Sequence, residues 1–128
     1  MDLHISTEEL ESVADIEDNC GRHISLVNDI YSYEKERLAS QSIEQEGAIL
    51  CNAVQVLANQ LDLGVAPARH MLWILIREWE YTHQDLVKRR MATLPKCTVE
   101  LQAYMNGLEY HMSGNELWSR TTKRYSQA

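Results

Sequence analysis

Proline and glycine are scarce in this sequence, which has 2 Pro and 5 Gly among its 128 residues. Because these residues interrupt helices and dominate turns, and because helix formers make up much of the rest, the composition predicts an all-α fold. No internal repeat, low-complexity segment or interdomain linker is visible. The length and the apolar content of 45% suit one domain with its own core.

Basic residues are also in deficit, with 12 Lys and Arg against 19 Asp and Glu, for a net charge of −7. A protein that binds nucleic acid needs a basic face, so we expect no nucleic-acid partner. The deficit does not exclude an anionic ligand, because a local cluster of Lys, Arg and bound cations can override the overall field.

Long apolar runs and paired cysteines are missing as well. The longest strongly apolar run, 71–76, is far too short to span a bilayer, so we expect no membrane partner. The three cysteines, Cys20, Cys51 and Cys97, are odd in number and widely spaced. They predict reduced thiols in a cytoplasmic protein and not a disulfide framework.

The first predicted helix occupies the N-terminal third of the chain. Ser6 or Thr7 is suited to cap it, with two glutamates in its first turn. The helical pattern continues to about Leu38, with Gly21 as its one weak point. A polar stretch from Ala39 to Glu46 predicts a loop.

Three further helices and a short final one are expected downstream. One covers roughly 47–63 and is stopped by Gly64, and the next carries Pro67 in its first turn and runs to about Met91. A helix from about Thr98 to Met112 is followed by a predicted interruption at 113–115. The final helix carries Trp118 towards Arg124.

The predicted helix at 47–63 is apolar around most of its circumference. A helix of that kind belongs in the interior of a larger structure. The remaining helices are too few to enclose it, so the pattern indicates that the chain is part of a domain.

The most informative segment is 28–36, where Asn28, Ser32 and Glu36 follow one another at intervals of four residues. On a helix each is displaced by only about 40° from the one before, so all three share one face. An amide, a hydroxyl and a carboxylate are hard oxygen donors suited to Mg²⁺. The pattern favours a magnesium site, although the same spacing also fits a solvated polar stripe on an ordinary helix.

Two further features of the sequence favour a magnesium site over a solvated polar stripe. Lys35 directly precedes Glu36 and would place a cation where a diphosphate needs one. Near the C-terminus, Arg124 and Tyr125 together offer five guanidinium donors and a phenol to phosphate oxygens.

These segments together resemble those of fungal sesquiterpene cyclases of the aristolochene synthase type, which are class I terpene synthases. They are Asn-Asp-x-x-Ser-x-x-x-Glu with Lys before the Glu at 28–36, and Trp-Ser-x-x-Thr-x-Arg-Tyr at 118–125. Shorter similar segments at 46–48, 77–80 and 107–110 extend the resemblance over essentially the whole chain.

The resemblance implies a partial helical bundle of the class I terpene synthase fold, with residues 1–128 forming the C-terminal part of the catalytic domain. The implied activity is that of a lyase of secondary metabolism, which cleaves the carbon–oxygen bond of farnesyl diphosphate and cyclises the product to a sesquiterpene hydrocarbon.

The resemblance also implies roles for particular residues. Asn28, Ser32 and Glu36 match the motif that binds one of three Mg²⁺ ions, and Lys35, Arg124 and Tyr125 match groups that hold the diphosphate. Trp118 matches a position where an indole face stabilises carbocations. An ordinary buried aromatic in the last helix is the other interpretation of Trp118.

The aspartate-rich motif of the family, which binds the other two ions, has no counterpart here. Glu8-Glu9 and Glu17-Asp18 are the only adjacent acidic pairs with any claim, and neither has a third carboxylate one turn on. We therefore expect a truncated chain with negligible cyclase activity alone, prone to self-association or to pairing with a chain that supplies the missing helices. The alternative is a non-catalytic helical interaction or pseudoenzyme domain.

Overall fold

Three long helices and two short ones make up the part of the chain that the structure describes. The structure is a computed structural model that describes residues 4–43 and 52–122, with side chains placed for 4–39 and 52–122. Within these residues there is no β-strand, as the composition predicts. The helices are α1 (Thr7–Glu11), α2 (Ala14–Ile43), α3 (Ala53–Gln60), α4 (Val65–Ala92) and α5 (Val99–Thr121).

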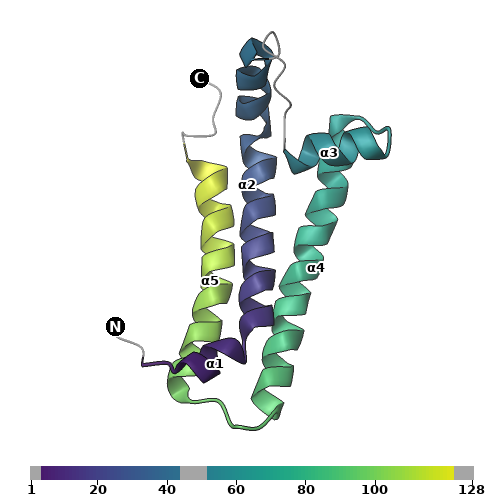
Figure 1. Cartoon of the computed structure of the whole chain (residues 1–128). Coiled ribbons are helices and arrows are strands. Elements are labelled where there is room, and N and C mark those ends of the chain that lie inside the picture. Colours follow the sequence, from purple (N-terminus) through teal and green to yellow (C-terminus); the bar gives the residue numbers. More distant parts are fainter. Residues whose placement is uncertain (1–3, 44–51, 123–128) are drawn as a thin grey trace.

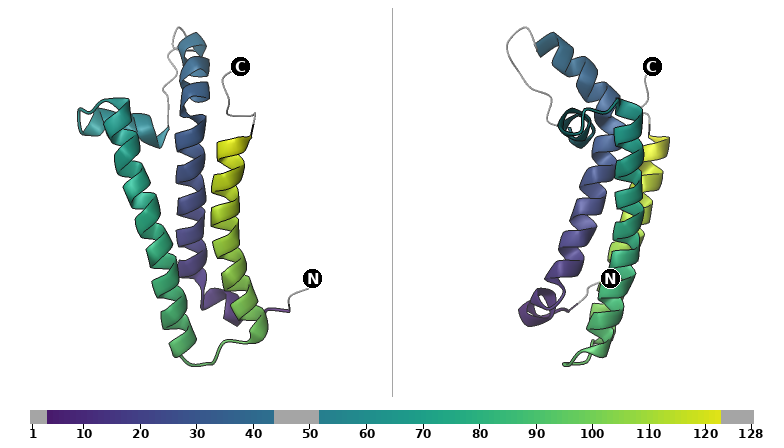
Figure 2. Two further views of the ribbon diagram at one scale, coloured as in Figure 1. Left: turned by 180° about the vertical axis from the view of Figure 1, so that it is seen from behind. Right: turned by 90° about the vertical axis from the view of Figure 1, so that its right-hand side faces the viewer.

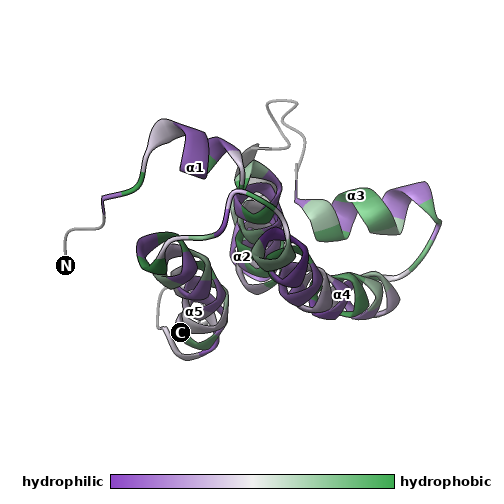
Figure 3. Ribbon diagram, turned by 90° about the horizontal axis from the view of Figure 1, so that it is seen from below, coloured by the Kyte–Doolittle hydropathy of each residue, from purple (hydrophilic) through white to green (hydrophobic). Residues whose placement is uncertain are grey.

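The long helix α2 lies against both of the other long helices, and the short α3 crosses the end of the bundle beside α2 and α4 (Figure 1 and Figure 2). Viewed along the helix axes, α4 and α5 lie on one side of α2, and α1 and α3 lie on the other (Figure 3). None of the described helices combines the length and the hydropathy of a membrane span.

Two apolar clusters hold the helices together, one at the middle of α2 and one near its start. The cluster where α3 crosses joins α2, α3 and α4 through Leu26, Val27, Ile30, Tyr33, Val54, Ala58, Ala68, Leu72 and Ile76. The cluster near the start of α2 joins it to α5 through Val13, Ile16, Cys97, Leu101 and Met105. Cys20 and Cys97 are buried free thiols.

The N-terminal helix is divided in two, which the sequence pattern did not predict. Ser6 caps α1 and forms a capping box with Glu9, whose carboxylate accepts from the Ser6 N–H. The helix ends at Glu11, and α2 begins at Ala14 after two intervening residues. The break therefore falls at Ser12 and Val13 and not at Gly21, which lies inside α2. Val13 is fully buried, so packing fixes this corner.

The predicted loop at 39–46 is wrong in its first half, because α2 continues to Ile43. The following predicted helix, 47–63, is also too long at both ends. Asn52 has extended backbone and caps α3, which starts at Ala53 and ends at Gln60. Residues 44–51 lie outside the described part of the chain.

A left-handed residue, not Gly64, stops α3. Asp62 has φ 52°, and the next N–H, that of Leu63, donates to the Ala58 carbonyl at 2.8 Å. This is the usual way in which a residue beyond a helix end satisfies the last carbonyls. Gly64 instead lies at the N-cap of α4.

The predicted helix with Pro67 in its first turn is confirmed, since α4 begins at Val65 and ends at Ala92. The predicted interruption at 113–115 is wrong, because α5 passes through it to Thr121. The Ser113 hydroxyl donates to the carbonyls of Glu109 and Tyr110, both at 3.3 Å, so its hydrogen bonding stays within α5.

Candidate metal centre

The three oxygen-bearing side chains of the predicted metal motif lie on a continuous stretch of α2. Ser32 and Glu36 are in direct contact, because the Ser32 hydroxyl donates to Glu36 Oε1 at 2.9 Å. Ser32 is buried, whereas Asn28 and Glu36 are half-buried. A hydroxyl oxygen and a carboxylate oxygen are thus already within the separation that two ligands of one small cation require.

Asn28 lies one turn earlier on α2 and faces α5. Its side-chain oxygen accepts from Asn115 Nδ2 at 3.4 Å, a long and weak hydrogen bond. The oxygen of Asn28 is therefore oriented by the neighbouring helix but not strongly committed to it. Asn115 is one of the residues at which the sequence pattern predicted a break, and its place in α5 depends on the helix continuing there.

Asn52 and Asp29, to which the sequence assigned no role, complete the surroundings of the motif. Asn52 Nδ2 donates to Glu36 Oε2 at 2.7 Å, and the same nitrogen donates to the Asp29 carbonyl at 2.7 Å. The Asp29 carboxylate accepts from the Ala53 N–H at 3.0 Å. The N-terminus of α3 is thus docked on the same turns of α2 that carry the motif.

Of the four remaining predicted site residues, the structure describes Lys35 and Trp118. Lys35 is exposed beside Glu36. Trp118 lies on α5 with 47% of its surface exposed, so the interpretation as an ordinary buried aromatic does not hold in this structure. Arg124 and Tyr125 lie outside the described residues. Glu34 forms an ion pair with Arg37 on its own helix.

A second polar cluster joins α4 to α5. The Arg77 guanidinium donates to both carboxylate oxygens of Glu116, at 2.8 and 3.0 Å, and also to Glu80. Glu116 is buried and accepts a further bond from Arg120 at 2.8 Å. Hydrogen bonding from Arg77 lowers the pKa of Glu116, against the opposing effect of burial.

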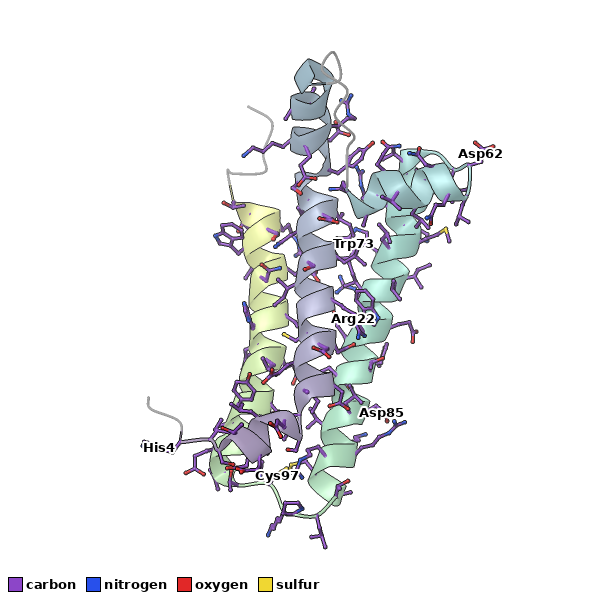
Figure 4. The ribbon with its side chains drawn as sticks, in the orientation of Figure 1. His4, Arg22, Asp62, Trp73, Asp85 and Cys97 are labelled. Atoms are coloured by element: carbon purple, nitrogen blue, oxygen red, sulfur yellow. The ribbon has the colours of Figure 1, made fainter. Side chains whose placement is uncertain are left out.

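Aromatic contacts link this cluster to α2, the helix that carries the predicted metal motif. The Arg77 guanidinium lies 5.2 Å from the ring centre of Trp73, a cation–π distance. Trp73, labelled in Figure 4, meets Tyr31 of α2 edge-on at 5.8 Å between ring centres. Tyr31 lies one residue before Ser32, so α4 packs against the part of α2 that carries the predicted motif.

A group of three potential metal ligands occurs in the described part of the chain at His23, Glu80 and Glu116, whose ligand atoms lie within 4.8 Å of one another. The carboxylates of this group are already neutralised by Arg77 and Arg120. A cation there would have to displace a guanidinium, so the arrangement serves as an ion-pair network and not as a second metal centre.

Comparison with known proteins decides the family. The family model described as "Terpene synthase family 2, C-terminal metal binding" matches residues 1–82, which include the whole of the 28–36 motif. The chain belongs to this terpene synthase family.

Individual relatives of this terpene synthase chain agree. It is 48% identical over 126 residues to aristolochene synthase from Penicillium roqueforti and 52% identical to aristolochene synthase from Aspergillus terreus. Each alignment covers 98% of the chain but only 37% and 39% of the relative. The chain therefore spans less than two fifths of these relatives.

The fold agrees with a solved structure as well. The crystal structure of aristolochene synthase from Penicillium roqueforti matches with a TM-score of 0.81 and 43% sequence identity, over 94% of this chain and 38% of that one. The class I terpene synthase fold expected from the sequence is confirmed.

The sequence analysis missed Asn52 as part of the site. An asparagine immediately before a helical pattern is a recognised N-cap signal, so the start of α3 could have been found. Its bond to Glu36 spans 16 residues and carries no local signal.

Proposed function

We propose that this chain forms the metal- and diphosphate-binding end of a sesquiterpene cyclase that ionises farnesyl diphosphate. The observation that carries the proposal is the alignment of Asn28, Ser32 and Glu36 on one stretch of α2, with Ser32 and Glu36 joined at 2.9 Å, in a chain of the terpene synthase family. We infer further that residues 1–128 correspond to the C-terminal part of a catalytic domain.

The donor set fits Mg²⁺. It consists of an amide oxygen, a hydroxyl and a carboxylate, all hard ligands, and it leaves other positions for water and phosphate oxygens. The Ser32–Glu36 contact supports this fit, because it brings two donors of the set together without any ion. When bound, Mg²⁺ would supply Lewis-acid neutralisation of the departing diphosphate.

The other site residues divide the work between the two developing charges. The allylic carbon–oxygen bond breaks with its electron pair on the leaving diphosphate, where Lys35, Arg124 and Tyr125 would hold the negative oxygens. The carbocation left behind closes a ring by attack of a carbon–carbon double bond and ends as a hydrocarbon by losing a proton. The exposed indole of Trp118 would face that cation.

This chain alone should not complete the reaction. It has no aspartate-rich motif, and it spans 37–39% of its aristolochene synthase relatives. Exposed apolar side chains support the proposal that it pairs with a chain that supplies further helices; they include Val56, Leu61, Met71, Ile74 and Leu117. The cytoplasm is the proposed location, since free thiols such as Cys20 and Cys97 persist there.

A chimera tests the function directly. The segment of Aspergillus terreus aristolochene synthase that aligns with this chain is replaced by the chain, and the product is assayed with farnesyl diphosphate and Mg²⁺. We expect a sesquiterpene hydrocarbon, and a loss of about 100-fold or more in rate with Glu36→Ala. Glu34→Ala is the matched control, because Glu34 is an acidic neighbour on α2 that pairs with Arg37.

The isolated chain separates this proposal from the non-catalytic alternative. Addition of Mg²⁺ with inorganic diphosphate should raise its melting temperature, and Glu36→Ala or Arg124→Ala should remove the increase. An inactive chimera, together with an isolated chain that does not respond to the ligands, would establish the pseudoenzyme interpretation instead.

A further inference from the structure

Both oxygens of the Glu36 carboxylate are held by side chains of this chain. Ser32 donates to Oε1 at 2.9 Å from one turn below, and Asn52 Nδ2 donates to Oε2 at 2.7 Å from the N-terminus of α3. Glu36 is half-buried and has three rotatable side-chain bonds, so without such contacts its carboxylate would sample several rotamers. The two donors restrict it to one.

The amide of Asn52 is fully used. Its nitrogen donates to Glu36 Oε2 and to the Asp29 carbonyl, both at 2.7 Å. Its oxygen accepts from the Val54 N–H at 2.8 Å and caps α3. The side chain is 0% exposed, so water cannot replace any of these partners. The identity and the orientation of this amide are thereby fixed.

Helix capping alone does not explain why the residue is asparagine. A cap needs only the acceptor oxygen, and Ser, Thr or Asp would provide it as well. The Asn52 side chain accepts from Val54 and donates twice, to the Asp29 carbonyl and to a carboxylate 16 residues earlier. A Ser or Thr hydroxyl has a single hydrogen to donate and an ionised Asp has none, so among these capping side chains only asparagine can make all three bonds.

We propose that Asn52 is a positioning residue for the metal centre, which holds the Glu36 carboxylate in the rotamer that binds Mg²⁺. The proposal rests on the function proposed above. Asp29 supports the same arrangement, because its carboxylate accepts from the Ala53 N–H and keeps the end of α3 on α2. A hydrogen-bonding neighbour that orients a metal ligand typically changes metal affinity by about 10- to 100-fold when it is removed.

Two substitutions separate positioning from capping. Asn52→Ser keeps an acceptor that caps α3 but is too short to reach Glu36. Asn52→Asp also keeps the cap and turns an oxygen toward Glu36 Oε2, where it repels instead of donating. The Mg²⁺ dissociation constant of the 128-residue chain, measured by calorimetry with inorganic diphosphate present, should rise by about 10-fold or more in both variants.

Two controls measure the structural part of the effect. Asp29→Ala loosens the same end of α3 but leaves both donors to Glu36 in place, so it should lower the metal-free melting temperature and raise the Mg²⁺ dissociation constant much less than the Asn52 variants do. Asn59→Ser changes an exposed asparagine on the same helix and should alter neither quantity.

The outcomes are distinct. If the unaltered chain binds Mg²⁺ and both Asn52 variants bind it equally well, Asn52 is only a helix cap and the proposed function stands. If Asp29→Ala weakens Mg²⁺ binding as much as the Asn52 variants do, α3 docking and not the Asn52 donor orients Glu36, and the inference fails. If the unaltered chain binds no Mg²⁺, this inference fails, and the activity of the chimera decides the proposed function.

Discussion

The Arg77 guanidinium on α4 holds both carboxylate oxygens of Glu116 on α5, at 2.8 and 3.0 Å. Two N–H groups of the guanidinium each donate to one oxygen of the carboxylate, which is the bidentate geometry typical of strong Arg–carboxylate pairs. Glu116 lies 39 residues from Arg77 and five residues before the end of α5. The pair therefore fixes the C-terminal end of α5, which carries Trp118, against α4.

Replacing Glu116 by glutamine should weaken the fold in a pH-dependent way. Arg77 lowers the pKa of Glu116 below its ordinary value of 4.5, so the stabilisation is present above that value and is lost as the pH falls through the lowered pKa. At neutral pH we expect Glu116→Gln to reduce the free energy of unfolding by about 1–3 kcal/mol. Urea unfolding at neutral and acidic pH measures both effects.

The unaltered chain should lose part of this advantage in acid, so the two curves of stability against pH should converge. Glu78→Gln is the control, because Glu78 is an exposed glutamate on α4. Parallel curves for the unaltered chain and Glu116→Gln would contradict the assigned role of Arg77.

Tyr104 should titrate late and make the fold sensitive to alkali. Burial and its hydrogen bond to Glu17, at 2.7 Å, raise the pKa of Tyr104 to about 12 from 10.0. Because the pKa of Tyr104 is higher in the folded state, its neutral phenol stabilises the fold below pH 10. This stabilisation is lost as the pH rises through the folded-state pKa. Tyr104→Phe should therefore remove one late-titrating tyrosinate and flatten the loss of stability between those values.

Tyrosinate absorbance during an alkaline titration checks this prediction. Tyr110→Phe is the matched control, since Tyr110 is 77% exposed on the same helix. If Tyr104→Phe leaves the late absorbance step intact, the bond to Glu17 does not form in solution.

Arg90 should be more important for stability than its neighbour Arg89. Its buried guanidinium donates to the Ser12 hydroxyl at 3.0 Å and to the carbonyls of Thr93 and Pro95 at 3.2 and 2.9 Å. It thus joins the α1–α2 corner to the segment after α4. Arg90→Met should lower the free energy of unfolding by about 2–4 kcal/mol, because it leaves buried carbonyls unpaired.

The side chain of the neighbouring Arg89 is 73% exposed and pairs with Asp85 one turn away. Arg89→Met should cost less than about 0.5 kcal/mol. Equal losses in the two variants, measured by urea unfolding, would show that the corner is not held by Arg90.

Gly114→Ala should stabilise the chain. Gly114 lies inside α5, and an added Cβ would meet nothing within 4 Å. Alanine is favoured over glycine within a helix by about 1 kcal/mol, so the melting temperature should rise. Gly64→Ala, at the N-cap of α4, should give no such gain. A destabilising Gly114→Ala would mean that the helix is interrupted there, as the sequence pattern alone predicts.

The local pattern of the sequence determined the helical class, the alignment of the metal motif and the start of α4. Each depends on short-range effects: helix propensity, the 3.6-residue period and the fixed φ of proline. The spacing of Asn28, Ser32 and Glu36 already implied one helix face, and the contact between Ser32 and Glu36 lies within a single turn.

Tertiary packing decided what local preference left open. The polar segment 113–115 stays helical, with Asn115 against Asn28 of α2, and the N-terminal helix breaks at the buried Val13 instead of at Gly21. The partners of Glu36 and Glu116 come from 16 and 39 residues away along the chain. Contacts of that range exist only after helices have packed, because no rule of sequence spacing relates residues on different helices.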